Sequence, residues 1–224
     1  MFRTRIENNN FVFTCEILPP KDGDYSALLE RLKDIVQYFD GLNIPSCPLG
    51  RLRAHSLSLA HILQEELNVE AIPHFTGRHH TVLSFQSELL GAQFLGIKNI
   101  LCVTGDKPSE GRGFYELSSI GLLKIARNLN QGLTESREKI KSATDFLLCT
   151  DYNPNVVNID AESRKAIEKF NNGAKVFFTQ PIFNVEKFGA ALMSFKNAVP
   201  QAKIIAGISY LHSKKLALKL QKFL

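Results

Sequence analysis

The chain has 224 residues, of which 44% are hydrophobic and 22% charged, a composition that is ordinary for a globular protein of one large domain or two small ones. No apolar stretch reaches the roughly 20 residues that span a bilayer, and the amino-terminal residues lack the apolar centre of a secretory signal, so we expect a cytoplasmic protein with no membrane segment. The net charge of +5 comes from scattered lysines and arginines, which argues against a nucleic-acid partner and suits a phosphorylated or carboxylated small ligand.

Seven short runs of apolar, β-branched or aromatic residues predict β-strands, and each run is followed by a segment with helical periodicity. Pro19 and Pro20 end the first strand, because proline cannot donate a hydrogen bond to a strand ladder. Strands that alternate with helices at this spacing form a parallel sheet. The strands are expected at residues 11–18, 41–44, 70–75, 98–104, 145–150, 175–180 and 203–208.

Four of the helical segments are well marked, because apolar residues recur at every third or fourth position. The last two end at glycine, a residue that favours the left-handed conformation found after many helices. Gly91 lies inside the third segment, where it suggests close packing against a neighbour. The segments cover residues 25–39, 51–67, 81–96 and 118–132.

Polar residues at the strand ends favour a barrel over an open sheet. Successive strands end in or near Glu16, Asn43, His74, Thr104 and Gln180. Polar groups that follow many strands on one rim are typical of the active face of a (β/α)8 barrel, whereas an open sheet has one switch point. We therefore predict an α/β fold of the TIM-barrel type with about seven βα units, forming a single domain over residues 1–224.

Glu16 is a carboxylate near the end of an otherwise apolar strand, in the stretch TCEILPP. Thr14 and Glu16 share one face of that strand because side chains alternate with a period of two. If that face is the barrel interior, Glu16 lies at the top of the bore, where burial raises the pKa of a carboxyl group and suits a general acid near neutral pH. The alternative is a structural carboxylate paired with a lysine or a backbone amide.

Asp106 and Gln180 also admit both a functional and a structural interpretation. Asp106 follows Gly105 and could either cap a loop or place a charge against a ligand. Gln180 could recognise the edge of a heterocycle through its amide or bond to neighbouring backbone. The stretch TGDKPSEGRG around Asp106 matches neither of the common glycine-rich phosphate loops.

No metal site is expected from the histidines or the cysteines. His79 and His80 lack the helical spacing of a metal-binding pair, and His74 suits a ligand contact or a core position. The four cysteines show no C-x-x-C spacing, which also argues against disulfides and a thiolate site.

Six motifs, in the same order, resemble those of the flavin-dependent methylenetetrahydrofolate reductases, most closely the bacterial branch. Each is weak alone, but six in order over almost the whole chain are specific. The resemblance implies a (β/α)8 barrel with FAD at the carboxyl face, where NADH or NADPH and then the folate bind in turn, and 5,10-methylenetetrahydrofolate is reduced to 5-methyltetrahydrofolate. The motifs are CEILPPK, PHFTGRHH, IKNILCVTGDKP followed by GFYELSSIGLL, YNPN, KFNNGAKVFFTQPIFN and IIAGIS.

The resemblance also implies catalytic roles for three residues. Glu16 matches the glutamate that protonates the 10-nitrogen of the folate, so that the ring opens to an electrophilic iminium. Asp106 matches the aspartate near the flavin pyrimidine edge and the folate, where its charge tunes the flavin and favours the cationic iminium. Gln180 matches the glutamine that contacts the pterin.

Further positions fall where the family contacts FAD. Among them, Lys169 suits the diphosphate or the adenosine end of the cofactor. The family also implies a cytoplasmic homo-oligomer in one-carbon and methionine metabolism. The positions are Asn43, His74, Thr104, Gly105, Asp106, Tyr115, Asn153, Glu162 and Lys169.

Two departures from the family pattern affect the expectation. The run GISYLHSKK lacks the usual proline and puts Lys214 near a position that is aromatic in the family. The chain also stops within the expected seventh helix, and a barrel that lacks its eighth unit would expose two edges. The chain is then a fragment, or a second copy or a partner subunit covers the gap, or the protein is a diverged relative. The alternatives are a non-catalytic or partner-dependent flavin- or folate-binding relative, and a different barrel enzyme that acts on a phosphorylated substrate.

Overall fold

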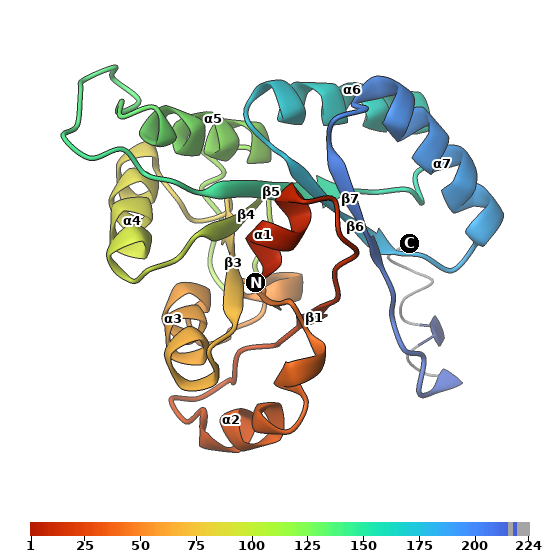
Figure 1. Cartoon of the computed structure of the whole chain (residues 1–224), viewed down its shortest axis with the longest axis horizontal. Helices are drawn as coiled ribbons and strands as arrows, with labels where there is room; N and C mark the ends of the chain where they lie inside the picture. The colour runs from red at the N-terminus through yellow and green to blue at the C-terminus, as the bar shows by residue number, and fades with distance from the viewer. Residues whose placement is uncertain (215–216, 219–224) are drawn as a thin grey trace. The chain divides into compact units, whose positions relative to one another are not determined.

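The computed structural model describes residues 1–214, 217 and 218. The chain divides into two compact units, residues 1–149 and 150–224, which we call unit 1 and unit 2. Strands and helices alternate along both units, and β5 (Leu147–Tyr152) begins in unit 1 and ends in unit 2 (Figure 1). The expectation of a single catalytic domain stays a prediction.

Unit 1 contains four complete strands that pair in chain order, and each pair is parallel. In this register Glu16 lies opposite Asn43, and His74 lies opposite Leu101. Parallel neighbours run in the same direction, so the carboxyl ends of these strands share one edge. The strands are β1 (Thr14–Glu16), β2 (Gly41–Ile44), β3 (Glu70–Thr76) and β4 (Asn99–Val103).

The α-helices of unit 1 that connect these strands lie on the outer side of the sheet (Figure 1). Their apolar faces bury side chains such as Leu63, Phe85 and Leu122 completely, and the Phe75 ring of β3 packs edge-on against Phe85 at 5.6 Å. No helix in the described part of the chain is both long and apolar enough to cross a membrane. The connecting helices are α2 (Ser26–Lys33), η1 (Val36–Tyr38), η2 (Pro48–Gly50), α3 (Ser56–Leu67), α4 (Val82–Phe94) and α5 (Ser119–Asn130).

A short helix that the sequence did not predict, α1 (Phe2–Glu7), covers the amino ends of β2 and β3. The Phe2 side chain is fully buried beside Gly41, the first residue of β2. The Arg3 backbone amide donates to Glu70 Oε2 at 3.0 Å, and its guanidinium donates to both carboxylate oxygens of Asp145. Helix α1 therefore anchors the end of the sheet opposite the polar strand ends.

Unit 2 packs two helices, α6 (Ile159–Asn171) and α7 (Val185–Ala198), beside two parallel strands. The strands are β6 (Val176–Pro181) and β7 (Lys203–Gly207), with an irregular register between Phe178 and Pro181. The aromatic core is formed by Tyr152, Phe177 and Phe195, whose rings meet edge-on around Phe195 at 4.9 and 5.0 Å. The Tyr152 hydroxyl donates to the Ala191 carbonyl at 3.1 Å, so this buried phenol is satisfied.

All seven predicted strands are present, with differences in their ends. The first was expected over residues 11–18, but its ladder covers only Thr14–Glu16; Phe11 and Phe13 are exposed and pack against each other. The helix expected from residue 51 begins at Ser56 instead, because the preceding loop bonds elsewhere: the Ala54 amide donates to the Pro20 carbonyl at 2.8 Å. The α/β class is confirmed.

The helix expected over residues 25–39 is shorter than predicted. Its α-helical part ends at Lys33, and the chain continues as the separate 3₁₀ turn η1. The expectation of close packing at Gly91 is wrong, because a Cβ placed there would meet no heavy atom within 4 Å. A Cβ at Gly77, by contrast, would overlap the Leu117 carbonyl oxygen.

We expect Gly91→Ala to raise the free energy of unfolding by about 0.5–1 kcal/mol, because alanine has the higher helix propensity and there is space for its methyl group. Gly77→Ala is the matched control and should lower the free energy of unfolding, since its methyl group would displace backbone. Urea unfolding of the three proteins measures both effects. A destabilised Gly91→Ala variant would show that the helix face at residue 91 is covered.

Candidate functional site

Strands β1 and β2 bring the side chains of Thr14, Glu16 and Asn43 to one face of the sheet. Glu16 and Asn43 are register partners on neighbouring strands, which lie about 4.8 Å apart in a sheet. The Asn43 Nδ2 atom donates to Thr14 Oγ1 at 3.0 Å, and Thr14 shares its strand face with Glu16. Glu16 and Asn43 therefore occupy paired positions on neighbouring strands, with their side chains on the same face of the sheet.

The Glu16 carboxylate is accessible to solvent, but surrounding protein atoms displace enough water to raise its pKa. The structural alternative requires a lysine or a backbone amide as a partner. Within residues 1–214, 217 and 218 no lysine, arginine or histidine forms an ion pair with it, and no hydrogen bond to its side chain is formed. An unpaired carboxyl group with a raised pKa has the properties of a proton donor.

Asn43 is buried, with 6% of its surface exposed. Its Oδ1 atom has no hydrogen-bond partner among the described residues. An unsatisfied buried acceptor costs on the order of 1–3 kcal/mol, so this oxygen is suited to receive a donor from a ligand.

Asp106 lies in an exposed loop after β4, and its carboxylate does cap neighbouring backbone. The Leu49 amide donates to Asp106 Oδ2 at 2.8 Å, and the Tyr115 hydroxyl donates to the Asp106 carbonyl at 2.9 Å. Leu49 and Tyr115 have left-handed backbone conformations, with φ of 56° and 49°. One carboxylate oxygen of Asp106 therefore has a structural partner in the loop after β2, and the charge effect on a ligand stays a prediction.

Arg78 is a site residue that the sequence analysis missed. Its side chain is buried, and its guanidinium donates to the carbonyl oxygens of Ser46, Cys47 and Asp106 at 3.0, 3.3 and 3.2 Å. These carbonyls belong to the loops after β2 and β4, whereas Arg78 follows β3. The available signal was an arginine directly after the strand-end glycine in the motif PHFTGRHH.

Three glycines let the loops after β2, β3 and β4 approach one another closely. A Cβ at Gly50 would overlap the Lys107 carbonyl oxygen, and a Cβ at Gly105 would lie 2.8 Å from Thr76 Cβ. Both glycines have left-handed φ angles, of 66° and 86°. Together with Gly77, they leave no room for a side chain between these loops.

The other predicted residues of unit 1 have structural contacts of their own. Thr104 is exposed, and its hydroxyl oxygen accepts a 3.4 Å hydrogen bond from the Ser119 amide at the start of α5. His74 is half-buried in β3, and its carbonyl accepts from Ser56 Oγ at 3.1 Å.

A cluster of two histidines and a carboxylate lies beside the β3 loop. Glu88 of α4 accepts from His55 Nε2 at 3.0 Å and from His80 Nε2 at 2.5 Å, and His80 Nδ1 contacts the Thr76 carbonyl at 2.5 Å. Burial alone would raise the pKa of Glu88, but the two histidines outweigh it and lower that pKa to about 2. Across the described residues, no three His, Cys, Asp or Glu side chains are arranged to hold a metal ion.

The predicted residues of unit 2 form two separate pairs. The Lys169 ammonium, nearly buried, donates to Asp151 Oδ1 and to the Asp151 carbonyl, both at 2.8 Å. The buried Glu162 accepts from the Asn153 amide at 3.0 Å and thereby holds the loop after β5. Gln180 is exposed near the end of β6 and forms no side-chain hydrogen bond within the described residues.

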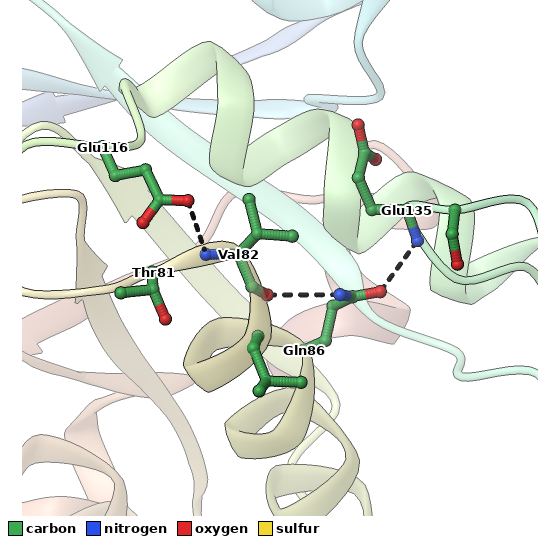
Figure 2. A pocket seen from close by; sticks show the side chains of 7 residues that line it. Thr81, Val82, Gln86, Glu116 and Glu135 are labelled. Carbon is green, nitrogen blue, oxygen red and sulfur yellow. Dashed lines mark hydrogen bonds between the residues drawn. The ribbon is translucent and has the colours of Figure 1, made fainter.

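A separate depression of about 540 Å³ lies beside the amino end of α4 and contains none of the predicted site residues. Figure 2 shows how its polar groups bind one another: the Val82 amide donates to Glu116, and Gln86 accepts from the Glu135 amide at 2.8 Å. The Gln86 Nε2 atom donates to the Val82 carbonyl at 3.2 Å. The Glu135–Gln86 bond joins the loop around residue 135 to α4, so the depression lies where that loop packs against the helix.

The family model described as methylenetetrahydrofolate reductase matches residues 1–224. No curated protein matches the chain. Among solved structures, an uncharacterized protein from Clostridium thermocellum that binds two copies of 5-methyl-5,6,7,8-tetrahydrofolic acid has a TM-score of 0.70 and 18% sequence identity. That match covers 100% of this chain and 74% of the other.

More distant solved structures share the fold. The tryptophan synthase complex from Pyrococcus furiosus matches with a TM-score of 0.58 and 11% identity, covering 94% of this chain and 83% of that one. A 2,3-dimethylmalate lyase matches with a TM-score of 0.58 and 9% identity, covering 98% and 81%. At such identities the likeness shows the fold alone, and together with the Clostridium match it confirms the TIM-type α/β fold. The seven predicted strands and six α-helices between them lie in the described part of the chain, whereas most of the helix expected after β7 lies outside the described residues.

We expect Glu88→Gln to remove a pH-dependent part of the folding stability. Because the pKa of Glu88 falls from 4.5 to about 2 on folding, its contribution is complete above pH 4.5 and is lost as the pH falls toward 2. A shift of this size corresponds to at most about 3 kcal/mol. The bond to Glu88 raises the pKa of His55, so that contribution is present below 6.5 and is lost as the pH rises through the raised value.

Urea unfolding at a series of pH values measures the difference between wild type and Glu88→Gln, which should be largest between about pH 5 and pH 6 and shrink on both sides. Glu30→Gln is the control, since Glu30 pairs with Lys33 on an exposed helix surface and should contribute little. A difference that does not change with pH would contradict the ionic role of Glu88.

Proposed function

Since the chain belongs to the methylenetetrahydrofolate reductase family, we propose that it reduces 5,10-methylenetetrahydrofolate to 5-methyltetrahydrofolate, with NADH or NADPH as reductant and FAD as cofactor. The match over residues 1–224 confirms the family resemblance of the six motifs. The observation that carries the proposal is the unpaired Glu16 carboxyl group beside the buried Asn43 amide, at the carboxyl edge of the strands. The Clostridium protein, which binds the proposed product, supports the substrate class.

Glu16 is proposed as the general acid. Its raised pKa increases the protonated fraction near neutral pH, when an ordinary glutamate is almost fully ionised. The protonated carboxyl group would donate to the 10-nitrogen of the folate, which favours ring opening to the iminium. Asp106, whose Oδ2 is fixed by the Leu49 amide, would place negative charge near that cation, and the exposed Gln180 amide would contact the pterin.

One feature of unit 1 suits a bound flavin: the buried Asn43 Oδ1 atom lacks a donor among the described residues and could accept one from the cofactor. When bound, FAD would accept hydride from the nicotinamide and pass it to the folate, in a ping-pong sequence. Lys169 already forms an ion pair with Asp151, so a bound diphosphate would share the Lys169 ammonium group with that carboxylate. The residues that would hold the cofactor are Asn43, His74, Thr104, Gly105, Asp106, Tyr115, Asn153, Glu162 and Lys169.

A second candidate function is folate or flavin binding without reductase activity. The Clostridium protein is described by folate binding alone, and Lys214 of this chain, near the position that is aromatic in the family, is exposed. The reductase proposal also includes a cytoplasmic location, a role in one-carbon and methionine metabolism, and a homo-oligomer or a partner subunit at the sheet edges.

Absorbance and transient kinetics of the purified protein separate these functions. A flavin spectrum, as purified or after reconstitution with FAD, is expected of the reductase and of a flavin-binding relative, and a protein that stays colourless would overturn both. A relative that binds folate alone would stay colourless. Anaerobic bleaching by NADH or NADPH, followed by reoxidation with methylenetetrahydrofolate, is expected only of the reductase.

We expect Glu16→Gln to lower kcat for folate reduction by about 10²- to 10⁴-fold, because the amide cannot donate the proton, while reduction of the protein by NADH or NADPH continues. In the wild type, folate reduction should slow as the pH rises through the raised pKa of Glu16, since the acid loses its proton. Stopped-flow measurement of the two half-reactions tests both statements.

Glu65→Gln, at an exposed position of α3, is the control and should leave both half-reactions unchanged. Glu16→Gln should be no less stable than wild type at neutral pH, because folding opposes the ionised form of Glu16. Equal loss of the two half-reactions in Glu16→Gln would exclude the acid role.

A further inference from the structure

Arg78 is a buried cation for which no carboxylate partner is found in the described residues. Its side chain is almost fully buried, with 4% of the residue exposed. None of the ion pairs of the described chain includes it, and its Nε atom faces His79 Nδ1 at 3.4 Å. Burial of a charge is unfavourable unless polar atoms surround it, so the carbonyl oxygens around the guanidinium must stabilise it.

Two of those carbonyl oxygens lie close in the chain to the donor and the acceptor of the Leu49–Asp106 hydrogen bond. Leu49 donates its amide to Asp106 Oδ2 at 2.8 Å. The Arg78 Nη1 atom donates to the carbonyl of Asp106 itself and to that of Cys47, two residues before Leu49. The guanidinium therefore holds together the two loop segments whose hydrogen bond orients the Asp106 carboxylate.

The loop held in this way is conformationally strained. Cys47 and Leu49 both have left-handed backbone conformations, with φ of 45° and 56°, which non-glycine residues rarely adopt. Such conformations persist only where the surroundings fix them. The planar fork of arginine can reach the Ser46, Cys47 and Asp106 carbonyls at once, which the single ammonium group of lysine cannot do in the same geometry.

The backbone of Arg78 is fixed as well. Its carbonyl accepts from the Phe114 amide at 2.8 Å, and the preceding Gly77 lies against the Leu117 carbonyl. Arg78 thus joins the loop after β2 to two parts of the loop after β4.

We propose that Arg78 is the positioning residue for Asp106, which fixes the direction of its carboxylate toward the folate. The Leu49 amide occupies Oδ2, while Oδ1 forms no hydrogen bond among the described residues and Asp106 is exposed, so one carboxylate oxygen is free for a ligand. This inference rests on the proposed function for its ligand, a reduced folate. The link from Arg78 to the Leu49–Asp106 bond does not depend on that function.

A double-mutant cycle tests the link to folate binding. Affinity for 5-methyltetrahydrofolate is measured by calorimetry on the purified holoprotein, for wild type, Arg78→Lys, Asp106→Asn and the double variant. Arg78→Lys should weaken binding by about tenfold in the wild-type background and by less than about twofold in the Asp106→Asn background. Equal losses in the two backgrounds would overturn the proposal, because Arg78 would then not act through Asp106.

Amide hydrogen exchange at Leu49 provides a readout that needs no ligand. Arg78→Lys and Asp106→Asn should both accelerate this exchange, whereas exchange at the buried core residue Leu122 should not change. Unchanged exchange at Leu49 in Arg78→Lys would refute the positioning role. If the wild type binds no folate, the proposed function fails, and Leu49 exchange still decides the role of Arg78.

Two further variants separate positioning from general stability. Arg3→Lys alters another multiply bonded arginine, at the opposite end of the sheet, and should lower Tm without changing Leu49 exchange or folate affinity. Arg78→Gln buries no charge and replaces Arg78→Lys if the latter does not fold; the same dependence on Asp106 is expected. If Arg78→Lys, like Arg3→Lys, lowered Tm and left Leu49 exchange and folate affinity unchanged, the proposal would be contradicted.

Discussion

Parallel pairing is the constraint on which the candidate site depends. Each strand of unit 1 must return through a crossover before the next one begins, so β1 to β4 all end at the same edge. The loops that leave these ends have to cross in a small space, and glycine at three positions makes this crossing possible. The carbonyl groups of the loops then converge, and a buried guanidinium can satisfy them together.

The two ends of the same strands differ in the polar groups that they carry. At the amino ends, α1 buries Phe2 and binds Glu70 and Asp145 through Arg3, which fixes the helix to the sheet. At the carboxyl ends, Glu16 and Asn43 carry groups without partners in the described structure. This division is typical of βα barrels, in which the carboxyl face supports chemistry and the opposite face supports folding.

The features that the sequence predicts well are those set by local pattern. Apolar runs located all seven strands, and the strand ends located Glu16 and Asn43, because both signals depend on residues close together in the chain. Arg78 was missed because its partners Ser46 and Asp106 are distant in sequence and present only backbone oxygens, which no residue pattern encodes. Gly91 was misread for a related reason, since the emptiness beside it depends on the packing of other elements.

The three glycines between the loops have a consequence for movement. Gly50 contacts the loop after β4 at Lys107, Gly77 contacts it at Leu117, and Gly105 within that loop contacts Thr76 at the end of β3. The loop after β4 is therefore in backbone contact on both sides, without the side-chain layer that lets neighbouring loops slide. We therefore expect the three loops to move together rather than singly, so that they form a rigid support at the carboxyl ends of the strands.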